Sequence, residues 1–232
     1  MKLTKTVKYN YKITEETLEK DIDKFIFESK RGAYQMDRHS NSEGLKIIKQ
    51  YLKIINEKFK QDELKECKEC YRKLIPFLFY ASGGQGENLF DYEDLLAKIS
   101  SDFEQYIKNY FTCLMKTCDI EELADAVSEY AIALDIYGFD SDKEILLGSL
   151  NKEQLNQLEE RMLIKTEGMT KKNQDKHDIL YFLLNLVQER GDKERYIQLC
   201  NRFKGVLGDK ELNYLIEEWE DGEDKDKWMG NR

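Results

Sequence analysis

Proline is nearly absent from this chain, with 1 in 232 residues, where average usage would give about 12. Proline breaks helices and is common in turns, edge strands and linkers. Its scarcity argues against a β-sandwich, a barrel or a proline-rich linker protein. We therefore expect a helix-rich fold.

Long apolar runs are also missing. No stretch of about 18 or more apolar residues occurs, so we expect no membrane-spanning segment. Residues 1–16 have none of the apolar core of a secretory signal. The cysteine count is odd, at 5, which favours reduced thiols over a disulfide framework. Together these features predict a cytoplasmic protein with no membrane partner.

Charge is plentiful but mixed. Charged residues make up 36% of the chain and the formal net charge is -9. Acids and bases interleave along most segments, whereas nucleic-acid binders usually show a basic face. We therefore expect no nucleic-acid partner. Two segments depart from the mixing, and they predict a basic arm at residues 1–13 and an acidic flexible tail at 221–232.

Residues 1–13 alternate apolar and polar side chains with the period of a β-strand. No second stretch offers a partner strand, and a lone strand leaves its backbone groups unpaired. The segment could pair with its own copy in a homodimer, add to another protein's sheet, or lie extended on the helices. The extended arm is the favoured interpretation.

Between arm and tail, apolar residues recur at helical spacing almost throughout. One stripe, for example, contains Leu45, Ile48, Leu52 and Ile55. The expected helices cover about 43–59, with Asn41 or Ser42 as N-cap, and then 64–78, 91–117, 120–137, 141–148, 151–165, 174–190, 192–205 and 209–220. Pro76 should kink or end its helix one turn before Tyr80. Gly followed by Asp at 191–192 and at 208–209 should stop one helix and cap the next.

The succession of helix, short turn and helix predicts an all-α fold. Successive helix pairs are offset by roughly 45–50 residues, which is near the HEAT repeat length. We expect either a right-handed stack of antiparallel helix pairs or an elongated helical bundle. A single helical domain should cover 14–220, with a sub-boundary near the polar connection at 166–173.

The decapeptide at 31–40 is the densest in chemically useful side chains. Arg31, Tyr34 and Arg38 fall at helical steps, and Asp37 and His39 would flank the same face. Arginines in such a patch could hold a phosphate or carboxylate by bidentate hydrogen bonds. The competing interpretation is a helix C-terminus that collects cations against its dipole.

Catalytic and metal motifs are missing. The two histidines, His39 and His177, limit acid–base chemistry, and no nucleophile elbow or metalloprotease motif occurs. Cys67 and Cys70 have a zinc-like spacing but lie on apolar stripes of one helix, where buried thiols act as small hydrophobes. We predict no metal, no cofactor and no enzymatic activity.

Several short features lie between residues 30 and 140: Arg31-Gly32 with Tyr34, the Tyr51-Leu52 helix, Leu123-Ala124, and Tyr137-Gly138-Phe139-Asp140. In these features the segment resembles the helical region of bacterial SWIM-type zinc-finger proteins. The finger itself needs Cys-x-Cys and Cys-x-His, and neither occurs in this sequence. The resemblance therefore implies a bacterial helical-repeat scaffold and carries no zinc or nucleic-acid role.

Helical repeats expose long surfaces that serve as binding platforms. The leading hypothesis is a non-enzymatic interaction or scaffold protein that binds another macromolecule, most plausibly a protein. The alternative is a regulatory domain that senses a small anionic ligand through Arg31, Arg38 and His39.

Overall fold

The computed structural model describes residues 12–34, 43–82, 95–134, 138–169, 173–208, 210–211, 213–217 and 219. The regular secondary structure in these ranges is helical throughout, which confirms the predicted all-α bundle or repeat fold. No helix within them combines the length and the apolar content that a membrane crossing needs. Residues 1–11 of the predicted arm and all of the predicted tail, 221–232, lie outside the described residues.

Backbone contacts divide the chain into two compact units, and each unit is built from two separate stretches of sequence. Unit 1 comprises Met1–Asp119 and Ala133–Ile145, and unit 2 comprises Ile120–Ile132 and Leu146–Arg232. The predicted limits of a single domain, 14–220, and the predicted sub-boundary at 166–173 stay predictions.

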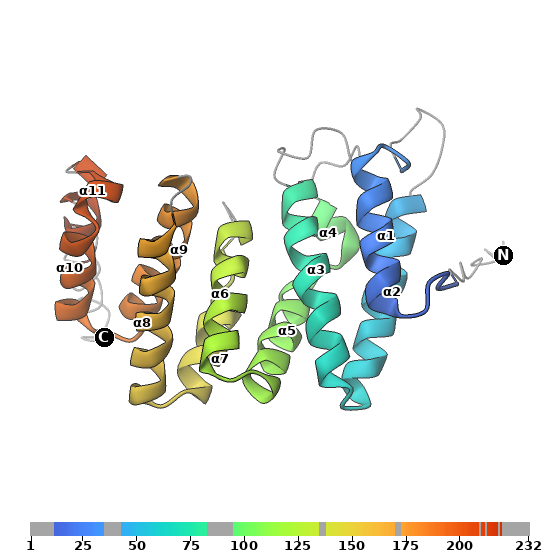
Figure 1. The fold of residues 1–232 in the computed structure, drawn as a ribbon, viewed down its shortest axis with the longest axis horizontal. Coiled ribbons are helices and arrows are strands. Elements are labelled where there is room, and N and C mark those ends of the chain that lie inside the picture. The colour runs from blue at the N-terminus through green and yellow to red at the C-terminus, as the bar shows by residue number, and fades with distance from the viewer. Residues whose placement is uncertain are drawn as a thin grey trace, which may run out of the picture. The chain divides into compact units, whose positions relative to one another are not determined.

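Unit 1 is centred on one long helix. Its helices are α1 (Leu18–Lys30), α2 (Glu43–Lys60), α3 (Leu64–Ser82), α4 (Leu95–Ile99) and α5 (Glu104–Thr117). A tight turn makes α2 and α3 antiparallel (Figure 1). Because α3 packs against α1, α2, α4 and α5, it is buried on more than one side. Cys67 and Cys70, on its predicted apolar stripes, are both fully buried.

Pro76 does not end its helix. It lies inside α3, which continues to Ser82, so the prediction of a helix end before Tyr80 is wrong. Proline has no N–H to donate to the carbonyl four residues earlier, a penalty of about 3 kcal/mol in an exposed helix. Here Ile75 and Phe77 on either side are buried, and their packing outweighs the local preference.

The helix predicted over 91–117 is also corrected. A turn at residues 101–103 separates α4 from α5. The hydroxyl of Ser100 accepts a hydrogen bond from the N–H of Asp102 at 3.1 Å, a local turn that competes with helical bonding. The apolar stripe runs on across the break, since Ile99, Phe103 and Ile107 are all buried. Periodicity alone therefore predicted one helix.

Unit 2 contains helices of its own and its share of the two helices that cross the division. The helices concerned are α6 (Ile120–Leu134), α7 (Asp140–Ser149), α8 (Lys152–Gly168), α9 (Asn173–Glu189), α10 (Lys193–Arg202) and α11 (Lys204–Leu207). Helix α9 packs against α8, α10 and α11, and the Tyr130 ring of α6 meets the Phe182 ring of α9 edge-on at 6.2 Å. The unit therefore has a core of its own.

The helix boundaries in unit 2 mostly agree with the predictions. Gly191 and Gly208 have positive φ, 73° and 80°, which favours glycine, and α9 and α11 end just before them, so both predicted stops are confirmed. The cap predicted at Asp209 lies outside the described residues. Asp192 caps α10 by accepting from the N–H of Arg195 at 3.1 Å. The connection predicted at 166–173 is shorter, because α8 extends to Gly168, and the helix predicted over 192–205 is divided at Phe203.

Candidate functional site

The predicted patch begins where α1 ends. Arg31 is the C-cap of α1 and its backbone N–H donates to the carbonyl of Glu28 at 3.0 Å. Gly32 then has φ of 83°, and residues 31–34 form a turn. Arg31 and Tyr34 therefore do not share the helix face that their spacing predicted.

Tyr34 packs back onto α1. Its hydroxyl donates to Glu28 Oε2 at 2.9 Å, and its ring lies 4.9 Å from the ring of Phe25. Both contacts fix the turn, so its visible role is structural. The other three residues of the patch, Asp37, Arg38 and His39, lie outside the described residues.

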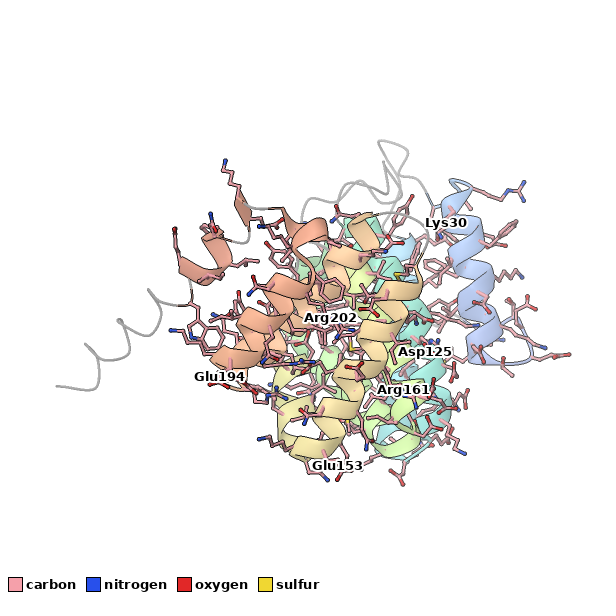
Figure 2. The ribbon with its side chains drawn as sticks, turned by 60° about the vertical axis from the view of Figure 1, so that its left-hand side comes forward. Lys30, Asp125, Glu153, Arg161, Glu194 and Arg202 are labelled. Atoms are coloured by element: carbon pink, nitrogen blue, oxygen red, sulfur yellow. The ribbon has the colours of Figure 1, made fainter. Side chains whose placement is uncertain are left out.

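A different set of side chains surrounds Arg31. The Arg31 guanidinium lies over the Phe27 ring at 5.3 Å, and the Lys30 ammonium lies over the Tyr80 ring at 5.5 Å. Both rings face solvent, with Phe27 60% exposed and Tyr80 41% exposed. We call these four residues the α1–α3 aromatic patch, after the two helices that carry them. Figure 2 shows Lys30 at the end of α1.

The charges of the patch differ from those on the rest of α1. Lys20 and Lys24 form ion pairs with Glu16 and Glu15 at 2.5 and 2.8 Å. Among the described residues, Lys30 and Arg31 form no ion pair, and aromatic faces are their recorded partners. The patch is thus a small cationic and aromatic surface, and it lies on a helix whose other lysines are neutralised.

Sequence reasoning missed Phe27 and Tyr80. The buried stripe of α1 contains Leu18, Ile22 and Phe25, and Phe27 lies off it. A large apolar residue outside the stripe of an otherwise amphipathic helix is the signal that could have identified this surface.

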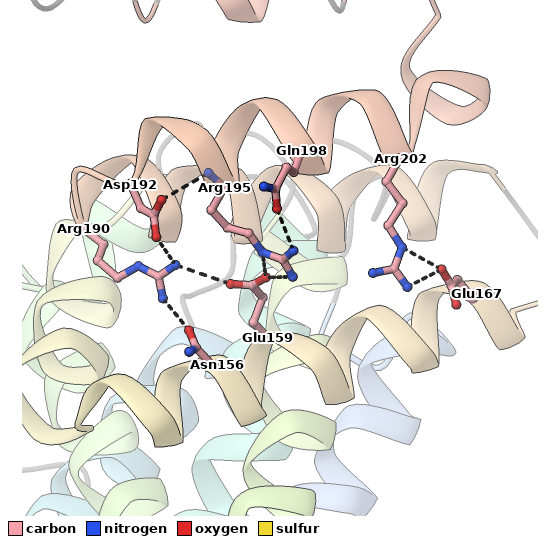
Figure 3. Close-up of polar contacts among 8 residues, drawn as sticks. All are labelled: Asn156, Glu159, Glu167, Arg190, Asp192, Arg195, Gln198 and Arg202. Carbon is pink, nitrogen blue, oxygen red and sulfur yellow. Dashed lines mark hydrogen bonds and ion pairs between the residues drawn. The ribbon is translucent and has the colours of Figure 1, made fainter.

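Unit 2 holds a second polar cluster around Glu159 of α8 (Figure 3). Glu159 is 3% exposed. Its Oε1 accepts from both Nε and Nη2 of Arg195, and its Oε2 lies 3.6 Å from Arg190 Nη2. A buried carboxylate held by two guanidinium groups ties α8 to α10 and to the end of α9.

The groove beside this cluster has a volume of about 500 Å³. Its ionisable lining consists of four acids and three bases: Glu159, Glu160, Asp192, Glu194, Lys152, Arg190 and Arg195. The arginines are already matched by carboxylates, with Arg190 Nη2 3.0 Å from Asp192 Oδ2. Since the balance of charge is not positive, we interpret the cluster as structural.

The cysteines behave as packing residues. All five lie in the described ranges and none forms a disulfide. Cys67 and Cys70 are fully buried, and burial raises the pKa of Cys70 to about 12. Within those ranges no group of three or more potential ligands could hold a metal ion.

His177, one of the two histidines in the sequence, lies near the start of α9. The structure places it half-buried on α9, where Nε2 lies 2.8 Å from Glu211 Oε1. The Tyr181 hydroxyl donates to the same oxygen at 2.6 Å, and the His177 and Tyr181 rings lie 4.5 Å apart. The imidazole therefore belongs to a contact between α9 and the segment that follows α11.

No protein-family model, curated protein or solved structure matches this chain. The resemblance to SWIM-type zinc-finger proteins therefore stays a prediction.

Proposed function

We propose that this protein acts by binding another protein, and that the α1–α3 aromatic patch is its contact surface. The observation that supports this is the exposure of the Phe27 and Tyr80 rings beside two cations without a carboxylate partner among the described residues. Aromatic residues and arginine are enriched at protein interfaces and supply most hot spots.

The buried ionisable groups support a binding role rather than catalysis. Glu159 joins helices in unit 2. In unit 1 the Asp21 carboxylate accepts from the Tyr51 hydroxyl at 2.7 Å and from the N–H of Thr14 at 2.8 Å. These contacts hold segments together and leave neither carboxylate exposed, since Asp21 is 0% and Glu159 is 3% exposed.

Site-specific photocrosslinking tests this role. A benzoylphenylalanine at position 27 should form a discrete adduct with a protein from the native cell. The matched control carries the same group at Tyr214, an aromatic residue of nearly equal exposure, 61% against 60% for Phe27.

The adduct's partner, produced in pure form, should bind the parent chain and lose at least about tenfold in affinity for Phe27→Ala with Tyr80→Ala. Both residues are exposed, so stability should change by about 0.5 kcal/mol or less. Identical adducts at positions 27 and 214, or none at 27, would reject the proposal.

A further inference from the structure

The cations of the α1–α3 aromatic patch are held in place yet keep their hydrogen-bonding capacity. A guanidinium that lies over a ring still presents its N–H groups at its edge, where a carboxylate can accept two of them. The Arg31 and Lys30 side chains already rest on Phe27 and Tyr80. Less side-chain entropy is then lost when an acidic group binds.

We propose that the patch recognises an acidic peptide segment of its protein partner. Carboxylates of the segment would meet Lys30 and Arg31, and an apolar side chain between them would lie on the exposed Phe27 and Tyr80 rings. This inference rests on the proposed function and adds the chemistry of the partner to it.

Charge complementarity decides between an acidic peptide and a nucleic acid. A strand of nucleic acid needs a continuous basic track and several phosphate contacts. The patch offers two cations, and the same helix carries the acids Asp23 and Glu28. With a net charge of -9, the chain as a whole repels a polyanion, whereas two or three carboxylates beside an apolar group need only the local pair of cations.

The small apolar area also limits the occupant. Two partly exposed rings cannot cover the continuous apolar face of an amphipathic helix, which docks through several anchors along its length. A short linear segment with one apolar anchor fits the described surface better. An affinity on the order of micromolar is the expectation for so small a contact.

Selection from a random peptide library displayed against the full chain tests this chemistry. The parent should enrich peptides in which acidic residues flank an aromatic or leucine residue. Lys30→Gln with Arg31→Gln should remove that enrichment and weaken the selected peptides at least about tenfold.

The matched control is Lys20→Gln with Lys24→Gln, which removes the same charge from the same helix but takes lysines already paired with Glu16 and Glu15. The peptides selected on the parent should bind this control variant with an affinity within about twofold of their affinity for the parent. An equal loss in this control would show attraction by net charge alone and would overturn the inference.

Three further results would also overturn it: no enrichment, equal binding of peptides whose acids are replaced by amides, or a stronger affinity for oligothymidylate. Inorganic phosphate or acetate that competes at millimolar concentration would instead favour a small-anion site and count against a peptide. A specific adduct at position 27 without acidic preference rejects this inference alone, whereas the absence of any such adduct rejects the proposed function.

Discussion

Asp21 shows how a single buried carboxylate can organise the start of unit 1. It is fully buried, and its two oxygens accept from the N–H and hydroxyl of Thr14, the N–H of Glu15, and the hydroxyl of Tyr51, at 2.7–3.1 Å. Such bonds replace the water that a carboxylate loses on burial. They join the residues before α1 to α1 itself and to α2.

Asp21→Ala should lower the free energy of unfolding by about 2–4 kcal/mol, because it removes the carboxylate that accepts from two backbone N–H groups and from the Tyr51 hydroxyl. The Tyr51 hydroxyl keeps its 3.2 Å bond to the backbone carbonyl of residue 21. Tyr51→Phe removes one donor and should cost about 1–2 kcal/mol. Urea unfolding measures both. The control is Asp23→Ala on the same helix, an exposed partner of Lys73, which should cost about 1 kcal/mol or less. Equal costs at 21 and 23 would contradict this account.

The Glu211 carboxylate should make the free energy of unfolding decrease at acidic pH. Burial by itself raises the pKa of Glu211, but the hydrogen bonds with Tyr181 and His177 outweigh it, and the net pKa is lowered. Because the unfolded chain binds the proton more readily, the stabilisation is complete above the unfolded pKa and is lost as pH falls through the lowered folded value.

Urea unfolding at a series of pH values between about 7 and 3 should therefore show a smaller acid loss of stability for Glu211→Gln than for the parent. Glu217→Gln, an exposed residue of the same C-terminal region, should keep the parent's dependence. The same slope in all three proteins would mean that the Glu211 contacts do not contribute.

At this scale the sequence singled out Arg31 as a candidate anion-binding residue, but it placed Arg31 and Tyr34 on one helix face, whereas α1 ends at Lys30 and residues 31–34 form a turn. It did not identify Asp21 or Glu159. An acidic residue on an amphipathic helix is normally solvated, and only the tertiary partners, Tyr51 for the one and Arg195 for the other, distinguish a buried acid from an exposed one. No spacing in the sequence encodes those partners.

At the scale of the helices, the ion pairs of Glu159 with Arg190 and Arg195 join α8 to the end of α9 and to α10. The Arg190 and Arg195 side chains are partly exposed, at 18% and 30%, whereas the Glu159 side chain is 3% exposed. Loss of the acid would leave two guanidinium groups close together without their shared partner. Neighbouring α6 and α8 are joined by a weaker, exposed pair, Arg161 with Glu121 at 3.4 Å; Figure 2 labels Arg161.

Glu159→Ala should therefore lower the unfolding free energy by about 3–5 kcal/mol, the usual cost of breaking a buried ion pair on one side. Glu160→Ala, the adjacent and exposed residue, is the control and should change stability by about 0.5 kcal/mol. Replacing Glu159, Arg190 and Arg195 together by apolar residues should recover much of the loss. Failure of Glu159→Ala to exceed Glu160→Ala in urea unfolding would contradict a structural role.

Element boundaries were predictable where their cause is local. Glycine with positive φ at 191 and the Asn151 capping box, in which the N–H of Gln154 donates to the Asn151 side chain at 3.0 Å, lie where the sequence placed helix ends. The helix end predicted near Pro76 and the continuous helix predicted across Ser100 were wrong. Packing of neighbours overrode a helix breaker in the first case. In the second, a turn after Ser100 interrupts the helix although the apolar stripe continues across it. The spacing of apolar residues indicates which side chains are buried, so it cannot reveal a break in a helix whose buried face continues on both sides of the break.

At the scale of the whole molecule, the important feature is that each unit is built from two separate stretches of sequence. Unit 1 needs Ala133–Ile145, although Ile120–Ile132 of unit 2 precedes that stretch. Within unit 1, the Phe139 ring lies 5.8 Å from Phe79 of α3 and 6.1 Å from Phe103. The N–H of Ser141 also donates to the Glu104 carboxylate of α5 at 3.2 Å.

A fragment of residues 1–119 therefore lacks part of its own core, whereas a fragment of residues 1–149 retains it. The shorter fragment should be less stable in urea by about 2 kcal/mol or more, the usual scale for losing a large buried side chain with its hydrogen bonds.

Phe139→Ala in the full chain makes the same test without truncation and should cost about 1–3 kcal/mol, since the ring is partly exposed. Ile164→Ala, at an apolar position that is 53% exposed, should change stability by about 0.5 kcal/mol. If Phe139→Ala matched Ile164→Ala and the two fragments were equally stable, Ala133–Ile145 would not belong to the core of unit 1. A chain truncated after residue 119 would then retain the full stability of unit 1. The contacts of Phe139 and Ser141 with α3 and α5 instead predict that unit 1 needs Ala133–Ile145 for its full stability.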